Sequence, residues 1–185
     1  MITIVSGLPR SGTSLMMKML EAGGMKPLID DIRTADVDNP KGYYEFERVK
    51  QLPQDTGWLP EAEGKVVKMV SMLLYELPKD YQYKVIFMRR AMPEILASQK
   101  KMLLRRNADM HIDDAEMKEL FEGHLKNMLA WLQTQPHLTA LEIWYNDVMK
   151  QPAVEVQKIN QFLGGNLKEA DMISVVDETL YRNRT

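Results

Sequence analysis

The sequence contains no cysteine in its 185 residues, so disulfide bonds and thiolate metal sites are excluded. It also has little excess charge, because the formal net charge of −2 provides no overall basic field for nucleic acid. No apolar run is long enough for a membrane-spanning helix, and no basic segment followed by an apolar stretch marks a secretory leader. These absences predict a soluble, cytoplasmic protein that does not bind nucleic acid.

The composition is that of an ordinary globular protein, with 45% hydrophobic and 27% charged residues. A chain of this length is expected to form a single domain, residues 1–185, with a substantial core. Apolar runs typical of strands alternate with segments of helical periodicity, which predicts an α/β fold in three layers, α/β/α, around a central parallel sheet. The expected strands are residues 2–5, 65–70, 84–88 and 138–145. The expected helices are residues 15–20, 93–103, 117–132, 152–163 and 167–173, and Asp113 and Asp114 are expected to cap the third of them.

The first twenty residues predict a strand, a loop and a helix, with Gly7 and Gly12 framing a G-x-x-x-x-G loop. A P-loop would have a lysine at the next position, where this chain has Thr13. Backbone N–H groups at the start of the helix can still hold an anion, and Arg10 can supply the missing positive charge. The loop and the first helical turn add three hydroxyl groups, from Ser11, Thr13 and Ser14.

The chain also lacks the acidic residue with which a P-loop nucleotidase organises magnesium after a hydrophobic strand. The strand at residues 84–88 ends in Arg89 and Arg90 instead, so cations and backbone amides are expected to neutralise the bound anion without a metal. In parallel sheets, ligands bind beyond the carboxyl ends of the strands. The glycine loop, Lys68, Arg89, Arg90 and Tyr145 are therefore expected to converge at one edge of the sheet.

Two of these segments resemble the donor-binding segments of sulfotransferases. Residues 8–14 are similar to the family's 5′-phosphosulfate loop, in the form that contains an arginine. Residues 85–90, with Ser98 eight residues after Arg90, are similar to the family's 3′-phosphate-binding strand, loop and helix.

Two further segments extend this resemblance. Residues 66–68 resemble the strand that brings a lysine to the transferring group, and residues 144–147, followed by Pro152 and residues 162–164, resemble a strand and helix whose tyrosine lies near adenine. The four matches follow one another in the family's order over roughly residues 2–165. The resemblance implies a P-loop nucleoside-triphosphatase-like fold.

The implied activity is metal-independent, in-line transfer of a sulfuryl group from 3′-phosphoadenosine 5′-phosphosulfate (PAPS) to a hydroxyl or amine of a small-molecule or carbohydrate acceptor. Arg10 would stabilise the leaving phosphate oxygen, and Lys68 would neutralise charge on the sulfuryl oxygens. The implied donor-binding residues are Arg10, Ser11, Gly12, Thr13 and Ser14 for the 5′-phosphosulfate, Arg90 and Ser98 for the 3′-phosphate, and Tyr145 for the adenine.

The chain departs from the family pattern at the general base, because Val70 occupies the position where cytosolic members have a histidine. Other branches use a glutamate from the segment after the first helix, where this chain has Glu45 and Glu47. Alternation predicts that both glutamates lie on one face of a short strand, with Glu45 as the first candidate base and Glu47 as the second. The histidines, which fit no motif, remain further candidates: His111, His124 and His137.

The family's carboxyl-terminal Arg-Lys-Gly element is also missing. Arg182 or Arg184 either closes the 3′-phosphate site or belongs to a basic tail. Two other functions remain open at this point: a P-loop nucleotide or small-molecule kinase, and a catalytically inactive nucleotide-binding protein of the same fold. The sequence identifies neither the acceptor nor the oligomeric state.

Overall fold

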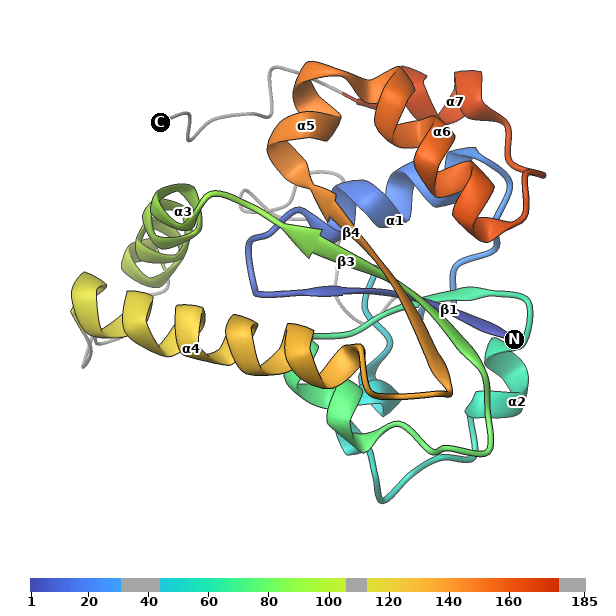
Figure 1. Ribbon diagram of the computed structural model, residues 1–185, viewed down its shortest axis with the longest axis horizontal. Coiled ribbons are helices and arrows are strands. Elements are labelled where there is room, and N and C mark those ends of the chain that lie inside the picture. The colour runs from blue at the N-terminus through green and yellow to red at the C-terminus, as the bar shows by residue number, and fades with distance from the viewer. Residues whose placement is uncertain (31–43, 106–112, 177–185) are drawn as a thin grey trace.

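The computed structural model describes residues 1–30, 44–105 and 113–176 (Figure 1). The strands are β1 (Ile2–Gly7), β2 (Val66–Lys68), β3 (Tyr83–Arg89) and β4 (Leu138–Trp144). The helices are α1 (Thr13–Ala22), α2 (Leu59–Ala62), α3 (Met92–Arg105), α4 (Asp114–Leu132), α5 (Tyr145–Lys150), α6 (Pro152–Leu163) and α7 (Glu169–Ser174). Two short 3₁₀ helices complete them, η1 (Glu47–Gln51) and η2 (Ser71–Glu76).

The four strands form one all-parallel sheet in the order β2-β1-β3-β4, which confirms the predicted sheet. The register pairs Val5 with Lys68 and Gly7 with Met88, so the ends of β2, β1 and β3 lie at the same edge. Because β3 pairs with β4 up to its last residue, the end of β4 lies there as well. This edge is where the predicted binding segments begin.

Alternate side chains of the strands form two separate cores, one on each face of the sheet. Val85 and Phe87 of β3 belong to the core covered by α2, η2 and α4. Ile86 and Met88 belong to the core covered by α1, α5, α6 and α7 (Figure 1). Since residues 85–88 of β3 are buried on both faces of the sheet, their sequence is continuously apolar rather than alternating, whereas β4 is largely exposed. The three predicted layers are confirmed.

The long helix α4 begins where its sequence predicts. Asp113 is the residue before its first turn, and its side chain accepts a hydrogen bond of 2.8 Å from the Glu116 N–H. This N-cap satisfies one of the donors that a helix start leaves unpaired. No helix in the described ranges is long and apolar enough to cross a membrane.

The predicted short strand that would carry Glu45 and Glu47 is wrong. The backbone N–H of Glu47 donates to Asp30 Oδ2 at 2.5 Å, and Glu47 begins η1. Phe46 turns into the core and packs edge-on against Trp58, with ring centroids 5.7 Å apart. The two glutamates therefore do not share a strand face, because burial of Phe46 and the hydrogen bond from the Glu47 N–H to Asp30 override the alternating pattern.

The second difference from the predicted elements concerns Tyr145, which was assigned to the fourth strand. The strand β4 ends at Trp144, and Tyr145 is the first residue of α5. The side chain of Tyr145 is buried and points toward the glycine loop.

Candidate functional site

The glycine loop between β1 and α1 lies tightly against its neighbours. A Cβ atom added to Gly7 would lie 2.6 Å from both the Met88 carbonyl oxygen and Ser11 Oγ. Gly12 has φ of +100°, and a Cβ atom there would lie 2.4 Å from Cδ2 of the Tyr145 ring. Because only glycine fits at either position, the loop forms a cradle of backbone with no side chain across it.

The start of α1 is suited to an anion. Gly12 is the N-cap residue and offers no side-chain cap, so the first N–H groups of the helix lack a cap from that residue. Ser11 Oγ is buried and has no hydrogen-bond partner among the described residues. Thr13 and Ser14 are the first two residues of the helix. A phosphate or sulfate group held here would supply acceptors for these donors.

Residues from three separate segments are joined by hydrogen bonds and stacking at the same edge of the sheet. Arg10 Nε donates to Ser98 Oγ at 2.8 Å, and the Arg90 guanidinium donates to the Arg10 carbonyl oxygen at 3.2 Å. The same guanidinium lies over the Tyr145 ring, 4.2 Å from its centroid. The structure thus brings together the predicted residues for both ends of the donor nucleotide.

Two further residues hold this cluster, and the sequence analysis missed their part in it. The buried Glu94 carboxylate accepts a hydrogen bond of 2.7 Å from Arg90 Nε and one of 2.8 Å from Asn146 Nδ2. Asn146 in turn accepts a hydrogen bond of 3.3 Å from the Ala91 N–H. The spacing of four residues between Arg90 and Glu94 is a sequence signal for an ion pair, and the structure places Arg90 just before α3 and Glu94 in its first turn. No comparable spacing in the sequence indicates the hydrogen bond between Asn146 and Glu94.

Lys68 and Glu45 form a second charged group at the end of β2. Lys68 Nζ lies 3.9 Å from Glu45 Oε1, and Lys50 Nζ lies 3.7 Å from Glu45 Oε2. Lys50 also pairs with Glu47, at 2.6 Å. The Glu45 side chain is 19% exposed against 36% for Glu47, so Glu45 is the more enclosed of the two candidate bases. Since Lys68 is paired with Val5 of β1, this group lies one strand away from the start of the glycine loop.

The candidate histidines His124 and His137 lie in different parts of the fold. His124 Nε2 lies 2.7 Å from Ser71 Oγ, and Ser71 is the residue that follows Val70 in the chain. Burial lowers the pKa of His124. The imidazole is therefore neutral at pH 7 and close to the position where the family pattern has its histidine. His137 immediately precedes β4, at the opposite edge of the sheet from the glycine loop. The remaining predicted candidates, His111, Arg182 and Arg184, lie outside the described residues.

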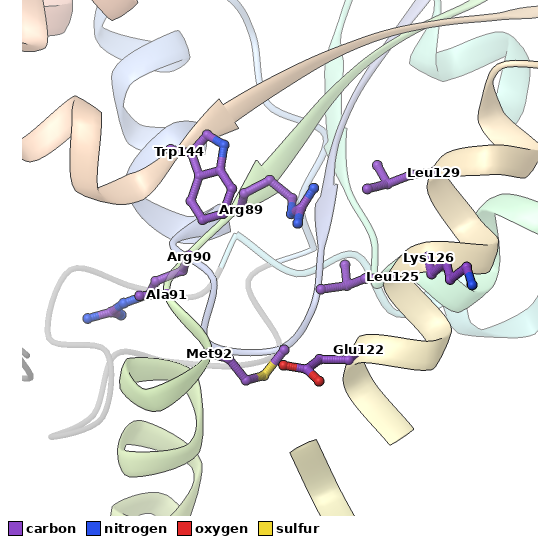
Figure 2. A pocket seen from close by; sticks show the side chains of 9 residues that line it. All are labelled: Arg89, Arg90, Ala91, Met92, Glu122, Leu125, Lys126, Leu129 and Trp144. Carbon is purple, nitrogen blue, oxygen red and sulfur yellow. The ribbon is translucent and has the colours of Figure 1, made fainter. Parts of the chain in front are cut away.

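Arg89 does not join the cluster, which corrects the expectation that both arginines would converge. Successive residues of a strand point to opposite faces, and the Arg89 side chain points to the face covered by α4. Its guanidinium lies 4.9 Å from the centroid of the Trp144 indole and donates to Glu142 at 2.5 Å. Figure 2 shows Arg89 and Trp144 at a hollow, about 330 Å³ in volume, from which the Arg90 side chain points away.

The hollow itself is largely apolar. It lies between α4 and the ends of β3 and β4, and Leu125 and Leu129 of α4 face it (Figure 2). It is separated by the sheet from the core that packs under the glycine loop. Across the described ranges, no group of three or more histidine, aspartate and glutamate side chains is arranged to hold a metal ion.

Comparisons with known proteins agree with this arrangement. The family model described as the sulfotransferase domain matches residues 2–184. Rat sulfotransferase 1A1 is 22% identical over 192 residues, which cover 97% of this chain and 65% of the rat protein. Mouse sulfotransferase 1A1 is 24% identical over 195 residues, with the same shares of the two chains covered. This chain thus spans a little less than two thirds of the length of these relatives.

The fold is also that of solved sulfotransferases. The sulfotransferase domain from the curacin biosynthetic pathway matches with a TM-score of 0.58 and 15% identity, over 95% of this chain and 77% of that domain. The sulfotransferase domain from the Synechococcus olefin synthase matches with a TM-score of 0.57 and 16% identity, over 100% of this chain and 83% of that domain. A mouse sulfotransferase complexed with PAP matches with a TM-score of 0.52 and 19% identity, over 95% of this chain and 62% of that protein. With its P-loop-like fold and a family match over nearly its whole length, the chain belongs to the sulfotransferase family.

Proposed function

We propose that the protein is a sulfotransferase that uses PAPS as its donor and transfers the sulfuryl group to a hydroxyl or amine of a small-molecule or carbohydrate acceptor. The observation that carries this proposal is the cluster of Arg10, Ser98 and Arg90, which unites the predicted 5′ and 3′ phosphate-binding residues at one edge of the sheet. The mouse sulfotransferase of the same fold is complexed with PAP, which is 3′-phosphoadenosine 5′-phosphate, the product that PAPS leaves after transfer, and this supports PAPS as the donor.

The residues of the glycine loop fit the 5′ end of such a donor. The first N–H groups of α1, the unpartnered Ser11 hydroxyl, and the hydroxyls of Thr13 and Ser14 would hold the 5′-phosphosulfate. Gly12 is needed because a side chain there would collide with Tyr145. Tyr145 would then lie beside the adenine, with Arg90 stacked on its ring.

The cations and the serine are suited to the rest of the donor. Arg90 and Ser98 would bind the 3′-phosphate, which an arginine can engage with two parallel hydrogen bonds. Arg10 extends from the glycine loop to Ser98, and its guanidinium would neutralise charge on the leaving phosphate oxygen. PAPS supplies the sulfuryl group, and Lys68 at the end of β2 would stabilise the charge on its oxygens.

Glu45 is our proposed general base. It lies 3.9 Å from Lys68 Nζ, so a carboxylate and a cation are both available at the end of β2. The Glu45 carboxylate would accept the proton of the acceptor hydroxyl or amine as the sulfuryl group is transferred. Glu47 is the second choice, because it is more exposed and pairs closely with Lys50.

The proposed transfer is metal-independent. The strand β3 ends at Arg89 and is followed by Arg90, where a magnesium-dependent nucleotidase has an acid, so charge on the donor would be neutralised by arginine, lysine and backbone amides. A kinase working through magnesium is the alternative that the test below separates.

The test is turnover with PAPS carrying a labelled sulfuryl group, in the presence of a chelator, across phenol, lipid-alcohol, carbohydrate and amine acceptors. We expect label in at least one acceptor and release of one 3′,5′-bisphosphate for each label transferred. A protein that leaves all acceptors unlabelled with PAPS but phosphorylates one of them with magnesium ATP would overturn the proposal.

A further inference from the structure

The Glu94 side chain is almost completely buried beside the proposed 3′-phosphate site, at 1% exposure. Each of its two carboxylate oxygens has a different partner, because Oε2 accepts from Arg90 Nε and Oε1 accepts from Asn146 Nδ2. A buried carboxylate is unfavourable unless it is paired and hydrogen-bonded. These two contacts meet that condition, and they connect the first turn of α3 to the first turn of α5.

The same contacts fix the orientation of the Arg90 guanidinium. Its Nε donates a hydrogen bond to Glu94, its Nη1 donates a hydrogen bond to the Arg10 carbonyl oxygen, and the guanidinium lies over the Tyr145 ring. An arginine side chain is long and flexible, so binding a phosphate normally requires it to be ordered. Here most of that order is already present in the protein.

Asn146 completes the arrangement by holding Glu94 from the other side. Its Oδ1 accepts from the Ala91 N–H at 3.3 Å, next to Arg90 in the chain, while its Nδ2 donates to Glu94. The asparagine is thereby fixed by the backbone of the same β3–α3 connection that carries Arg90. A rotation of Glu94 away from Arg90 would break its hydrogen bonds to both Arg90 and Asn146.

We propose that Glu94, held by Asn146, is a positioning residue that orients Arg90 toward the 3′-phosphate and so makes the donor site selective for adenine nucleotides with a 3′-phosphate over those with a 3′-hydroxyl. This inference rests on the proposed function of the same site. It assigns Glu94 and Asn146 no contact with the donor, only with the residues that bind it.

A competing role for Glu94 predicts the opposite sign. If the carboxylate only neutralised the Arg90 charge, its removal would leave a more positive site, and phosphate binding would become tighter. If it positions Arg90, its removal lets the guanidinium leave its place, and binding becomes weaker. The sign of the change in affinity therefore separates positioning from neutralisation.

The test compares the affinities of two probes, 3′-phosphoadenosine 5′-phosphate and adenosine 5′-phosphate, for the full chain and its variants by calorimetry. In Glu94→Gln the side chain keeps its shape, but its amide group must face one of the two donors. We expect about tenfold weaker binding of the bisphosphate, which is about 1.4 kcal/mol, and unchanged binding of the monophosphate. A purely structural defect would weaken both probes alike.

Three further variants make the result specific. Glu155→Gln is the matched control, because Glu155 of α6 is also a buried glutamate and forms an ion pair with Lys158 of the same helix. Glu155 is not part of the cluster around Arg90, so we expect this variant to bind both probes with the wild-type affinities. Asn146→Ala leaves all charges in place and is expected to weaken bisphosphate binding in the same direction, which keeps the test open should Glu94→Gln not fold. In the Arg90→Ala background, Glu94→Gln is expected to change the bisphosphate affinity no further.

The outcomes separate this inference from the proposed function. A wild-type protein that binds the two probes equally would overturn the 3′-phosphate site and this inference with it. A wild-type preference for the bisphosphate that persists or increases in Glu94→Gln and Asn146→Ala would overturn the positioning role alone.

Discussion

The substitution Gly12→Ala tests how closely the glycine loop depends on Tyr145. Gly12 has φ of +100°, a conformation that costs a residue with a Cβ atom about 1–2 kcal/mol. The new Cβ atom would also lie 2.4 Å from the Tyr145 ring. Moving that ring costs a further 1–3 kcal/mol or so, the usual range for an overpacked site. The free energy of unfolding is thus expected to fall by about 2–5 kcal/mol.

The control is Gly24→Ala, since Gly24 has nearly the same φ of +103° but nothing within 4 Å of an added Cβ atom. It isolates the backbone cost, so its unfolding temperature should fall by about 2–8 °C, against about 4–20 °C for Gly12→Ala. Bisphosphate binding should be unchanged in Gly24→Ala. In Gly12→Ala it should weaken by about tenfold or more, because Arg90 is stacked on the ring that must move.

Equal unfolding temperatures for the two variants, together with wild-type bisphosphate binding by Gly12→Ala, would refute this reasoning. In that case the Tyr145 ring would move away from the new Cβ atom at no cost in free energy of unfolding. The packing of Gly12 against Tyr145 would then have no effect on binding at the proposed donor site.

Four other substitutions test separate parts of the account. Arg90→Ala and Ser98→Ala should each weaken bisphosphate binding by about 1.5–3 kcal/mol, the usual worth of a hydrogen bond to a charged group, and unchanged titrations for both would remove these residues from the 3′-phosphate site. Glu45→Gln should slow turnover by about 10²–10⁴-fold with bisphosphate affinity intact, and a full rate would move the base to Glu47 or His124. Burial lowers the pKa of His137, so protonation in the unfolded state opposes folding below the ordinary histidine pKa of about 6.5. His137→Phe should therefore reduce the loss of thermal stability between pH 8 and pH 5.5, and an identical loss in the wild type and the variant would contradict this assignment.

The framework of the fold could be predicted because the middle of the sheet is buried on both faces. Residues 85–88 form a continuous apolar run and lie in β3, and the N-cap of α4 was readable from Asp113. The sequence could not predict that residues 44–46 lie outside any strand, because their alternation is equally compatible with a strand. Only the tertiary contact between Phe46 and Trp58 decides it.

The candidate site was predictable where a local motif exists and not where contacts depend on tertiary structure. The glycine loop and the spacing between Arg90 and Ser98 are visible in the sequence, and both indicate the proposed donor site. That Arg10 reaches Ser98 is a contact across 88 positions of sequence, which no local pattern specifies. The pairing of Glu94 with Asn146 and of His124 with Ser71 is of the same kind.

The central claim is that this site binds a 3′-phosphorylated adenine nucleotide without a metal. Calorimetric titration of the wild-type protein with 3′-phosphoadenosine 5′-phosphate in a chelator, and separately with ATP and magnesium, tests it most directly. We predict saturable binding of the bisphosphate in the chelator and much weaker binding of ATP. Tight, magnesium-dependent binding of ATP with no response to the bisphosphate would contradict the claim.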